Sequence, residues 1–139
     1  MPSLLVVEDD RPTHALFVAL VNRCGCKARS AFDGRSALRQ IRAERPDGIV
    51  LDLLLPGMNG VELLNEMDGF APELVARTIV VTAASESLVQ GCAQMRLVRN
   101  VMRKPFNIEE LEHDLRMMLA GRPAEEKKRA GGPMRLKIS

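Results

Sequence analysis

Short apolar runs alternate regularly along the sequence with segments that have helical periodicity. The first run, Leu4 to Val7, consists of four apolar residues and is followed at once by acidic residues. A short continuous apolar run is typical of a strand that is buried on both faces of a sheet. Five strand and helix pairs with short connections therefore predict an α/β domain, in which a parallel sheet carries helices on both faces.

Turn and capping residues place the boundaries of these segments. Asp33 is suited to cap a helix, Pro12 to open one, and Asn107 with Glu110 three residues later has the pattern of a capping box. We expect strands at Leu4–Val7, Lys27–Ala31, Gly48–Leu51, Thr78–Val81 and Asn100–Arg103. We expect helices at Thr13–Arg23 and Gly34–Ala43, from Val61 to Met67, from Ser85 to Met95, and after Asn107 with an apolar face of Ile108, Leu111, Leu115 and Met118.

Length and charge divide the chain into one domain and a short extension. The chain has 139 residues, of which 46% are hydrophobic and 27% charged, values that suit one globular domain with a full core. The segment Gly121-Arg122-Pro123 marks the end of this domain. We therefore expect a domain at 1–121 and a tail at 122–139, with no separate output domain. The basic residues of the tail are Arg122, Lys127, Lys128, Arg129, Arg135 and Lys137.

Composition argues against a membrane protein, a secreted protein and a nucleic-acid-binding protein. The longest apolar run has seven residues, far below the ~18 that a membrane span needs. The N-terminus has no basic segment before its first apolar run, and three cysteines do not suggest a disulfide framework. The chain has four aromatic residues, all Phe, and its tail has no helix-turn-helix pattern, so we do not expect a nucleic-acid partner. We expect a cytoplasmic protein without a membrane partner.

Polar side chains follow four of the five expected strands at the point where each strand ends. Glu8 and Asp9 follow the first strand, Asp52 the third, Thr82 the fourth and Lys104 the fifth. In open parallel α/β sheets these carboxyl ends lie along one edge, where ligands bind. We therefore expect these five side chains to surround one pocket.

Three carboxylates at one sheet edge repel one another and require a cation. Glu8, Asp9 and Asp52 carry three negative charges, which one Mg²⁺ ion and the ammonium of Lys104 would neutralise. Mg²⁺ prefers oxygen ligands and is often shared with phosphate oxygens. A zinc site is not expected, because the pattern places neither of the two histidines near this edge, and none of the cysteines.

The chemistry that such a pocket favours is phosphoryl transfer to a carboxylate. Asp52 would attack a phosphorus atom, while Lys104 and a metal ion would offset the charge on the phosphoryl oxygens. Thr82 would donate its hydroxyl to a phosphoryl oxygen after the transfer. The acyl phosphate is more negative than the carboxylate that it replaces, so Thr82 and the backbone after it would be drawn inward as a switch.

Four motifs that contain these residues resemble the receiver domain of bacterial two-component response regulators. The motifs are Glu8-Asp9, Asp52-Leu53-Leu54-Leu55-Pro56-Gly57-Met58-Asn59-Gly60, Thr82-Ala83 and Lys104-Pro105-Phe106. The intervals of 30 residues from Asp52 to Thr82 and 22 from Thr82 to Lys104 also match, and the resemblance covers residues 1 to about 120. It implies a flavodoxin-like (βα)5 doubly wound parallel sheet with the strand order 2-1-3-4-5.

The resemblance also implies a role for each polar residue at the strand ends. Asp52 is the phosphoacceptor, Thr82 is the switch hydroxyl, and Lys104 reaches the phosphoryl group. The bond between Lys104 and Pro105 is expected to be cis. The phosphodonor that the family implies is a sensor histidine kinase or a histidine phosphotransfer protein.

The metal site implied by the resemblance lies in an acidic pocket that Glu8 and Asp9 form. Asp9 and Asp52 bind Mg²⁺ there, together with the main-chain carbonyl of Leu54. Asp10 is expected to cap the first helix rather than to bind the metal.

The chain departs from the family pattern at four positions. Val101 stands where an aromatic switch residue is usual, three residues before the lysine, so the output face is expected to be built differently. Leu97 replaces a glycine where the fourth helix usually ends, so helix is expected to continue there. Leu54 and Ala84 occupy positions that tune the lifetime of the acyl phosphate. Both are apolar and cannot orient an attacking water, which predicts slow autodephosphorylation.

We interpret the chain as a stand-alone receiver that signals by phosphorylation-dependent protein–protein contact, not as an enzyme acting on another substrate. The downstream target is unknown, and a homodimer through the fourth helix, fifth strand and fifth helix is a further arrangement. Arg96, Arg99 and Arg103 form either a solvated face or a docking surface for an acidic partner. A phosphorylation-independent scaffold is the alternative, which Val101 favours. An aspartate-nucleophile phosphatase is not expected, because Leu54 stands where its second acid is required.

Overall fold

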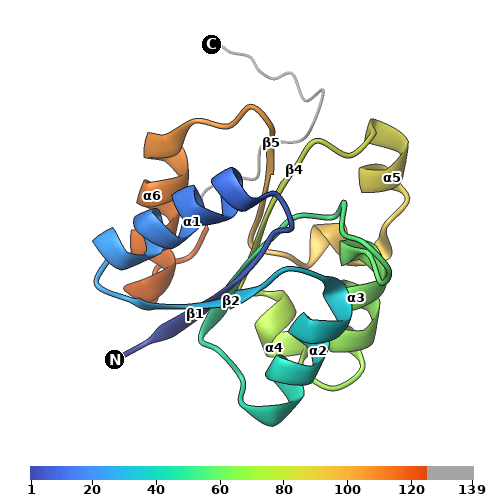
Figure 1. Cartoon of the computed structure of the whole chain (residues 1–139), viewed down its shortest axis with the longest axis horizontal. Helices are drawn as coiled ribbons and strands as arrows, with labels where there is room; N and C mark the ends of the chain where they lie inside the picture. Colours follow the sequence, from blue (N-terminus) through green and yellow to red (C-terminus); the bar gives the residue numbers. More distant parts are fainter. Residues whose placement is uncertain (125–139) are drawn as a thin grey trace.

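The computed structural model describes residues 1–124 of the chain, which form one parallel sheet with helices on both sides (Figure 1). The strand order is β2-β1-β3-β4-β5, which confirms the predicted flavodoxin-like topology. The strands are β1 (Ser3–Val7), β2 (Lys27–Ala31), β3 (Gly48–Leu51), β4 (Thr78–Thr82) and β5 (Asn100–Arg103). All five expected strands are therefore present.

Helices α1 and α6 cover one face of the sheet, and the remaining helices cover the other (Figure 1). The helical segments are α1 (Arg11–Arg23), α2 (Gly34–Ala43), α3 (Gly60–Asp68), α4 (Pro72–Val75), α5 (Glu86–Gln90), the 3₁₀ helix η1 (Ala93–Arg96) and α6 (Ile108–Leu119). The sequence pattern did not predict α4, a single turn that begins with a proline.

Side chains of the central strands alternate between two cores. In β1, Leu5 and Val7 belong to the core on the side of α2 and α3, whereas Leu4 and Val6 belong to the core on the side of α1 and α6. All four side chains are completely buried, as expected for a continuous apolar run in a parallel sheet. The burial of apolar surface on both faces stabilises the sheet.

Side-chain caps fix the starts of the main helices. Asp10, Asp33 and Asn107 each accept a hydrogen bond from the backbone N–H three residues later, at 3.1, 2.8 and 3.0 Å. These caps agree with the sequence analysis. Asn59 and Glu62 form a complete capping box at the start of α3, which the sequence analysis did not single out.

The segment after Ser85 differs from the helix that the sequence predicted. Helix α5 ends at Gln90, and η1 follows only after Gly91 and Cys92. Glycine has a low helix propensity, and Cys92 adopts an extended backbone with φ −89° and ψ 115°, so the helix is interrupted there. Leu97 is the C-cap of η1, so the additional helix expected in this connection is limited to the short 3₁₀ helix that precedes it.

The buried face of α6 also differs from the prediction. Ile108 is 43% exposed, since the whole first turn of α6, residues 107–110, faces solvent, whereas Asp114 is buried. Arg99 Nε donates to Asp114 Oδ1 at 2.9 Å, and the Arg99 side chain is only 8% exposed. Arg99 therefore belongs neither to a solvated face nor to an exposed docking surface.

The predicted basic tail at 122–139 lies outside the described residues from 125 onward. Its first residue, Arg122, accepts a hydrogen bond on its backbone carbonyl from Arg99 Nη1 at 2.9 Å. The division into a domain at 1–121 and a tail stays a prediction. Within residues 1–124, no helix is both long enough and apolar enough to cross a membrane.

Candidate functional site

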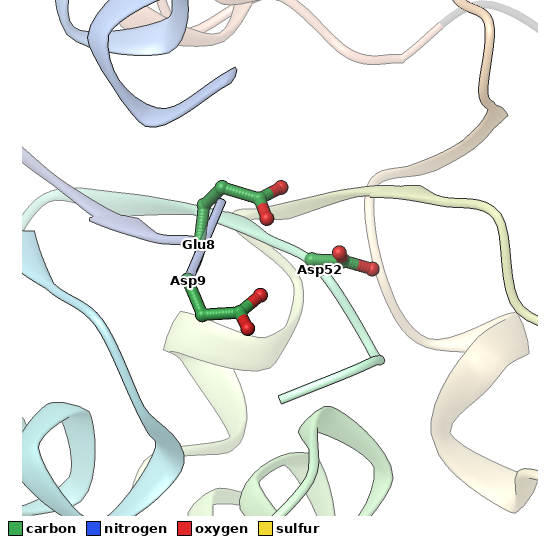
Figure 2. Close-up of side chains that lie close together, drawn as sticks. All are labelled: Glu8, Asp9 and Asp52. Carbon is green, nitrogen blue, oxygen red and sulfur yellow. The ribbon is translucent and has the colours of Figure 1, made fainter. Parts of the chain in front are cut away.

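Parallel pairing brings the carboxyl ends of β1 and β3 together. Val7 pairs with Leu51, so Glu8 and Asp52 leave neighbouring strands at the same level. One carboxylate oxygen from each of Glu8, Asp9 and Asp52 lies within 4.8 Å of the others. Figure 2 shows that the three carboxylates point to the same side of the strand ends. The acids that the sequence predicted to meet do meet.

Lys104 reaches this acidic cluster from the end of β5. Its Nζ lies 2.8 Å from Oε1 of Glu8 and 3.1 Å from Oδ2 of Asp52. The side chains of Glu8 and Asp52 are 1% and 5% exposed, and that of Lys104 is 21% exposed. Partial exclusion of water strengthens these attractions relative to a surface ion pair. The Lys104–Pro105 peptide bond is cis, as the sequence analysis expected.

Burial and pairing change the protonation equilibria of two members of the cluster. Burial raises the pKa of Glu8 above its ordinary value, and this effect outweighs the hydrogen bond from Lys104, which acts in the opposite direction. Burial acts to lower the pKa of Lys104, but its hydrogen bond to Glu8 and the charge of Asp52 raise that pKa overall. Lys104 therefore stays a cation at neutral pH.

The loop after β3 orients the Asp52 carboxylate. The backbone N–H of Leu54 donates to Asp52 Oδ1 at 3.1 Å, while the other oxygen faces Lys104. The loop then folds back on the start of α3, where a Cβ atom at Gly60 would lie 2.6 Å from both the Asp52 carbonyl oxygen and the Leu53 Cα. Only glycine permits this close approach of two backbone segments.

Thr82 lies beside Lys104, but its hydroxyl makes a local contact. The Lys104 N–H donates to the Thr82 carbonyl at 2.9 Å, which ties the ends of β4 and β5 together. Thr82 is completely buried, and its Oγ1 accepts a hydrogen bond from the Ala84 N–H at 3.1 Å. Within residues 1–124, this is the only hydrogen bond of the Thr82 side chain. The structure thus places Thr82 next to Lys104 in the sheet, and the Thr82 hydroxyl makes no hydrogen bond to Asp52.

The donor set of the acidic cluster suits a hard divalent cation. The ammonium of Lys104 leaves two of the three negative charges of Glu8, Asp9 and Asp52 uncompensated. The Asp9 side chain is exposed and, in the described part of the chain, has neither a hydrogen bond nor an ion pair. All available ligand atoms are oxygens, which matches Mg²⁺ rather than zinc.

The sequence analysis missed His14, which lies next to the acidic cluster. Its Nδ1 lies 2.8 Å from the Glu8 carbonyl oxygen and its Nε2 lies 2.8 Å from Ser30 Oγ. The ring also stacks on Phe32, with 4.2 Å between centroids. The expectation that neither histidine lies near this edge is therefore wrong. Both ring nitrogens already have partners, so His14 supports the turn after β1 and is not a metal ligand. The position of His14 in the first turn of the helix that follows Asp10 was the signal that could have placed it near the strand end.

Comparisons with known proteins agree with this geometry. The protein-family model for the response regulator receiver domain matches residues 4–116 of the chain. The chain belongs to the response regulator receiver family. This receiver is 32% identical over 117 residues to the response regulator MprA of Mycobacterium tuberculosis, which covers 84% of this chain and 50% of MprA. The chain thus spans about half the length of that relative.

Two further proteins support the family assignment. The receiver is 30% identical over 117 residues to sporulation initiation phosphotransferase F of Bacillus subtilis, which covers 84% of this chain and 92% of that protein. The solved receiver domain of Francisella response regulator 1452 superposes with a TM-score of 0.74 at 25% identity, over 87% of this chain and 98% of the other.

The receiver differs from the usual pattern on the face that carries α5. Val101 is 9% exposed and belongs to the core on that face, together with Ala84 and Val98. Position 101 therefore places a small aliphatic side chain, and no aromatic ring, in this core.

Proposed function

We propose that this receiver accepts a phosphoryl group on Asp52 and signals through a phosphorylation-dependent contact with another protein. The observation that carries the proposal is the arrangement of the Asp52 carboxylate, which is held by Lys104 and by the Leu54 N–H beside two further acids. The phosphodonor is a phosphohistidine on a sensor histidine kinase or a histidine phosphotransfer protein.

The transfer step follows from the chemistry of these groups. An oxygen of Asp52 forms a bond to phosphorus while the bond between phosphorus and the donor imidazole nitrogen breaks, and the imidazole leaves with the electron pair. Lys104 offsets charge on the phosphoryl oxygens, and the Thr82 hydroxyl donates a hydrogen bond to one of them. The chain thereby acts as a phosphoacceptor switch rather than as an enzyme with a separate substrate.

The acidic cluster supplies the ligands for Mg²⁺ in this proposal. Asp9, Asp52 and the main-chain carbonyl of Leu54 would hold the ion, with Glu8 completing the acidic pocket. When bound, the ion neutralises negative charge on the carboxylates and on the incoming phosphoryl group. Because Lys104 already pairs with both Glu8 and Asp52, Asp9 is the acid that the ion most directly compensates.

The location and the partners of the receiver complete the proposal. Its three cysteines are free thiols, which fits a reducing compartment such as the cytoplasm. The downstream partner is a protein, and a homodimer through α5, β5 and α6 is one arrangement by which the phosphorylated form could signal.

Incubation with acetyl phosphate and Mg²⁺, followed by intact-mass measurement, tests the proposal. We expect a single phosphoryl adduct on the wild type and none on Asp52→Asn. Beryllium fluoride with Mg²⁺, observed by NMR, provides a second probe of the same site. If the wild type forms neither an adduct nor a beryllium fluoride complex, the proposal fails. The chain is then better described as a phosphorylation-independent scaffold, the alternative that Val101 favours.

A further inference from the structure

A chain of hydrogen bonds connects the last residue of β5 to the Thr82 hydroxyl. The Arg103 guanidinium donates through Nη2 to the Ala84 carbonyl oxygen. The N–H of the same residue, Ala84, donates to Thr82 Oγ1 at 3.1 Å. Since β4 and β5 pair Thr82 with Arg103, the loop after β4 is held between the two strand ends.

Arg103 contacts the loop through a hydrogen bond and not through an ion pair. Within residues 1–124 its guanidinium has no carboxylate partner, and its Nη1 is buried without a hydrogen-bond partner. A buried donor without an acceptor costs free energy, which is recovered if the guanidinium moves to water. Arg103 is therefore suited to be released when the loop moves.

The position of Arg103 explains why its side chain can reach this loop. Residues two apart in a strand point to the same face, so Arg103 shares its face with Val101. Val101 and Ala84 belong to the same core, and both have small side chains. The guanidinium reaches the Ala84 carbonyl on this face of the sheet, where position 101 carries no aromatic ring.

We propose that Arg103 is a positioning residue that holds the loop after Thr82 in its unphosphorylated arrangement, and that phosphorylation of Asp52 breaks the Arg103–Ala84 hydrogen bond. This inference rests on the proposed function. The added phosphoryl charge attracts the Thr82 hydroxyl and the backbone after it. Ala84 cannot move with Thr82 while Arg103 binds its carbonyl oxygen. The hydrogen bond to Arg103 and the attraction to the phosphoryl group therefore favour two different positions of this loop.

The competition determines the direction of a measurable effect. An interaction that exists in only one of two states favours that state, and its removal favours the other. Replacement of Arg103 by a residue that cannot donate a hydrogen bond therefore shifts the unmodified receiver toward the arrangement that binds the phosphoryl group. The receiver should then bind a phosphoryl mimic more tightly.

The test is a titration of the full chain with beryllium fluoride at constant Mg²⁺, followed through the amide NMR signals of Thr82 and Ala84. We expect Arg103→Met to lower the midpoint of the titration by about tenfold, the lower end of the range for one hydrogen bond to a charged group. Before any beryllium fluoride is added, its Ala84 signal should already lie displaced toward the wild-type complex. Arg103→Lys, which keeps a donor and the charge, should lie between Arg103→Met and the wild type.

Arg39→Met is the matched control. It removes one positive charge from an exposed residue of α2 that has no hydrogen bond or ion pair within the described residues, and it should leave the midpoint unchanged. An unchanged or higher midpoint for Arg103→Met, while the wild type still binds beryllium fluoride, overturns this inference and leaves the proposed function standing. A wild type that binds no beryllium fluoride overturns both. Lower thermal stability of Arg103→Met without a change in midpoint would show a merely structural role.

Discussion

Lys104 and Glu8 are 96 residues apart in the chain, yet Nζ of the lysine lies 2.8 Å from Oε1 of the glutamate. The contact joins the ends of β1 and β5, two strands that are not neighbours in the sheet. It passes beside Asp52, to which the same ammonium also binds. One cation therefore sets the charge that the acidic cluster presents to a metal ion or to a phosphoryl group.

The buried glutamate predicts a specific dependence of stability on pH. The pKa of Glu8 is raised chiefly by burial, so the native state holds its proton more tightly than the unfolded state does. The contribution of Glu8 to the free energy of unfolding therefore falls as the pH rises from the ordinary value of 4.5 through the raised native pKa. Glu8→Gln should lack this decrease.

Urea unfolding between about pH 4.5 and 7.5 measures the effect, because the loss of stability begins at the ordinary carboxyl pKa of 4.5 and continues through the raised native pKa. As the pH rises, the free energy of unfolding of the wild type should fall relative to that of Glu8→Gln. A pH-independent difference would contradict the prediction. Lys104 contributes no slope in this range, because its raised pKa keeps it charged well above neutral pH.

Asp9 and Asp10 should respond differently to the same substitution. Asp9 has no protein partner within the described residues, whereas Asp10 accepts hydrogen bonds from Thr13 at the start of α1. We expect Asp9→Asn to weaken Mg²⁺ binding by more than about tenfold and to raise stability without Mg²⁺, since like charges in the cluster are reduced. Asp10→Asn keeps a capping side chain and should retain Mg²⁺ binding. Isothermal titration calorimetry distinguishes the two, and equal losses would argue against the assigned ligands.

Gly60 and Gly69 form a second matched pair. A Cβ atom at Gly60 would lie 2.6 Å from backbone atoms of the loop that carries Asp52, whereas at Gly69 the nearest atom lies 3.4 Å away. We expect Gly60→Ala to cost about 1–3 kcal/mol of unfolding free energy through overpacking, and to weaken Mg²⁺ binding because the loop is displaced. Gly69→Ala should stay within about 0.5 kcal/mol of the wild type. Similar denaturation midpoints for the two variants would refute the close-approach argument.

The lifetime of the acyl phosphate should depend on position 54. Leu54 is 48% exposed at the mouth of the site and offers no group that orients water, so the phosphorylated wild type should decay slowly. Leu54→Asn introduces a polar group there without disturbing a packed core and should accelerate the decay. Loss of the adduct from phosphorylated protein, followed by mass measurement after removal of acetyl phosphate, gives both rates. Decay of the wild type within seconds would contradict the prediction.

Local patterns predicted most of the secondary structure for physical reasons that are themselves local. The apolar run Leu4 to Val7 indicated a doubly buried strand, and Asp10 indicated a cap, because both signals act within a few residues. Two predictions that were wrong have different causes: the first overlooked the low helix propensity of Gly91, and the second depended on how α6 packs. The expected helix after Ser85 is interrupted at Gly91 and Cys92, and Ile108 faces solvent although it has helical spacing with buried residues.

The order of residues is enough to predict that acids, a hydroxyl and a lysine follow the strands of a parallel sheet, since strands end where apolar runs stop. Which of these groups are in contact depends on the three-dimensional packing. Lys104 pairs with Glu8 as well as with Asp52, Thr82 bonds to Ala84 rather than to the cluster, and Arg103 holds the loop between them. These contacts depend on distances between strands that are separated by whole helices. No spacing along the chain encodes such distances, because they follow from how the two cores pack.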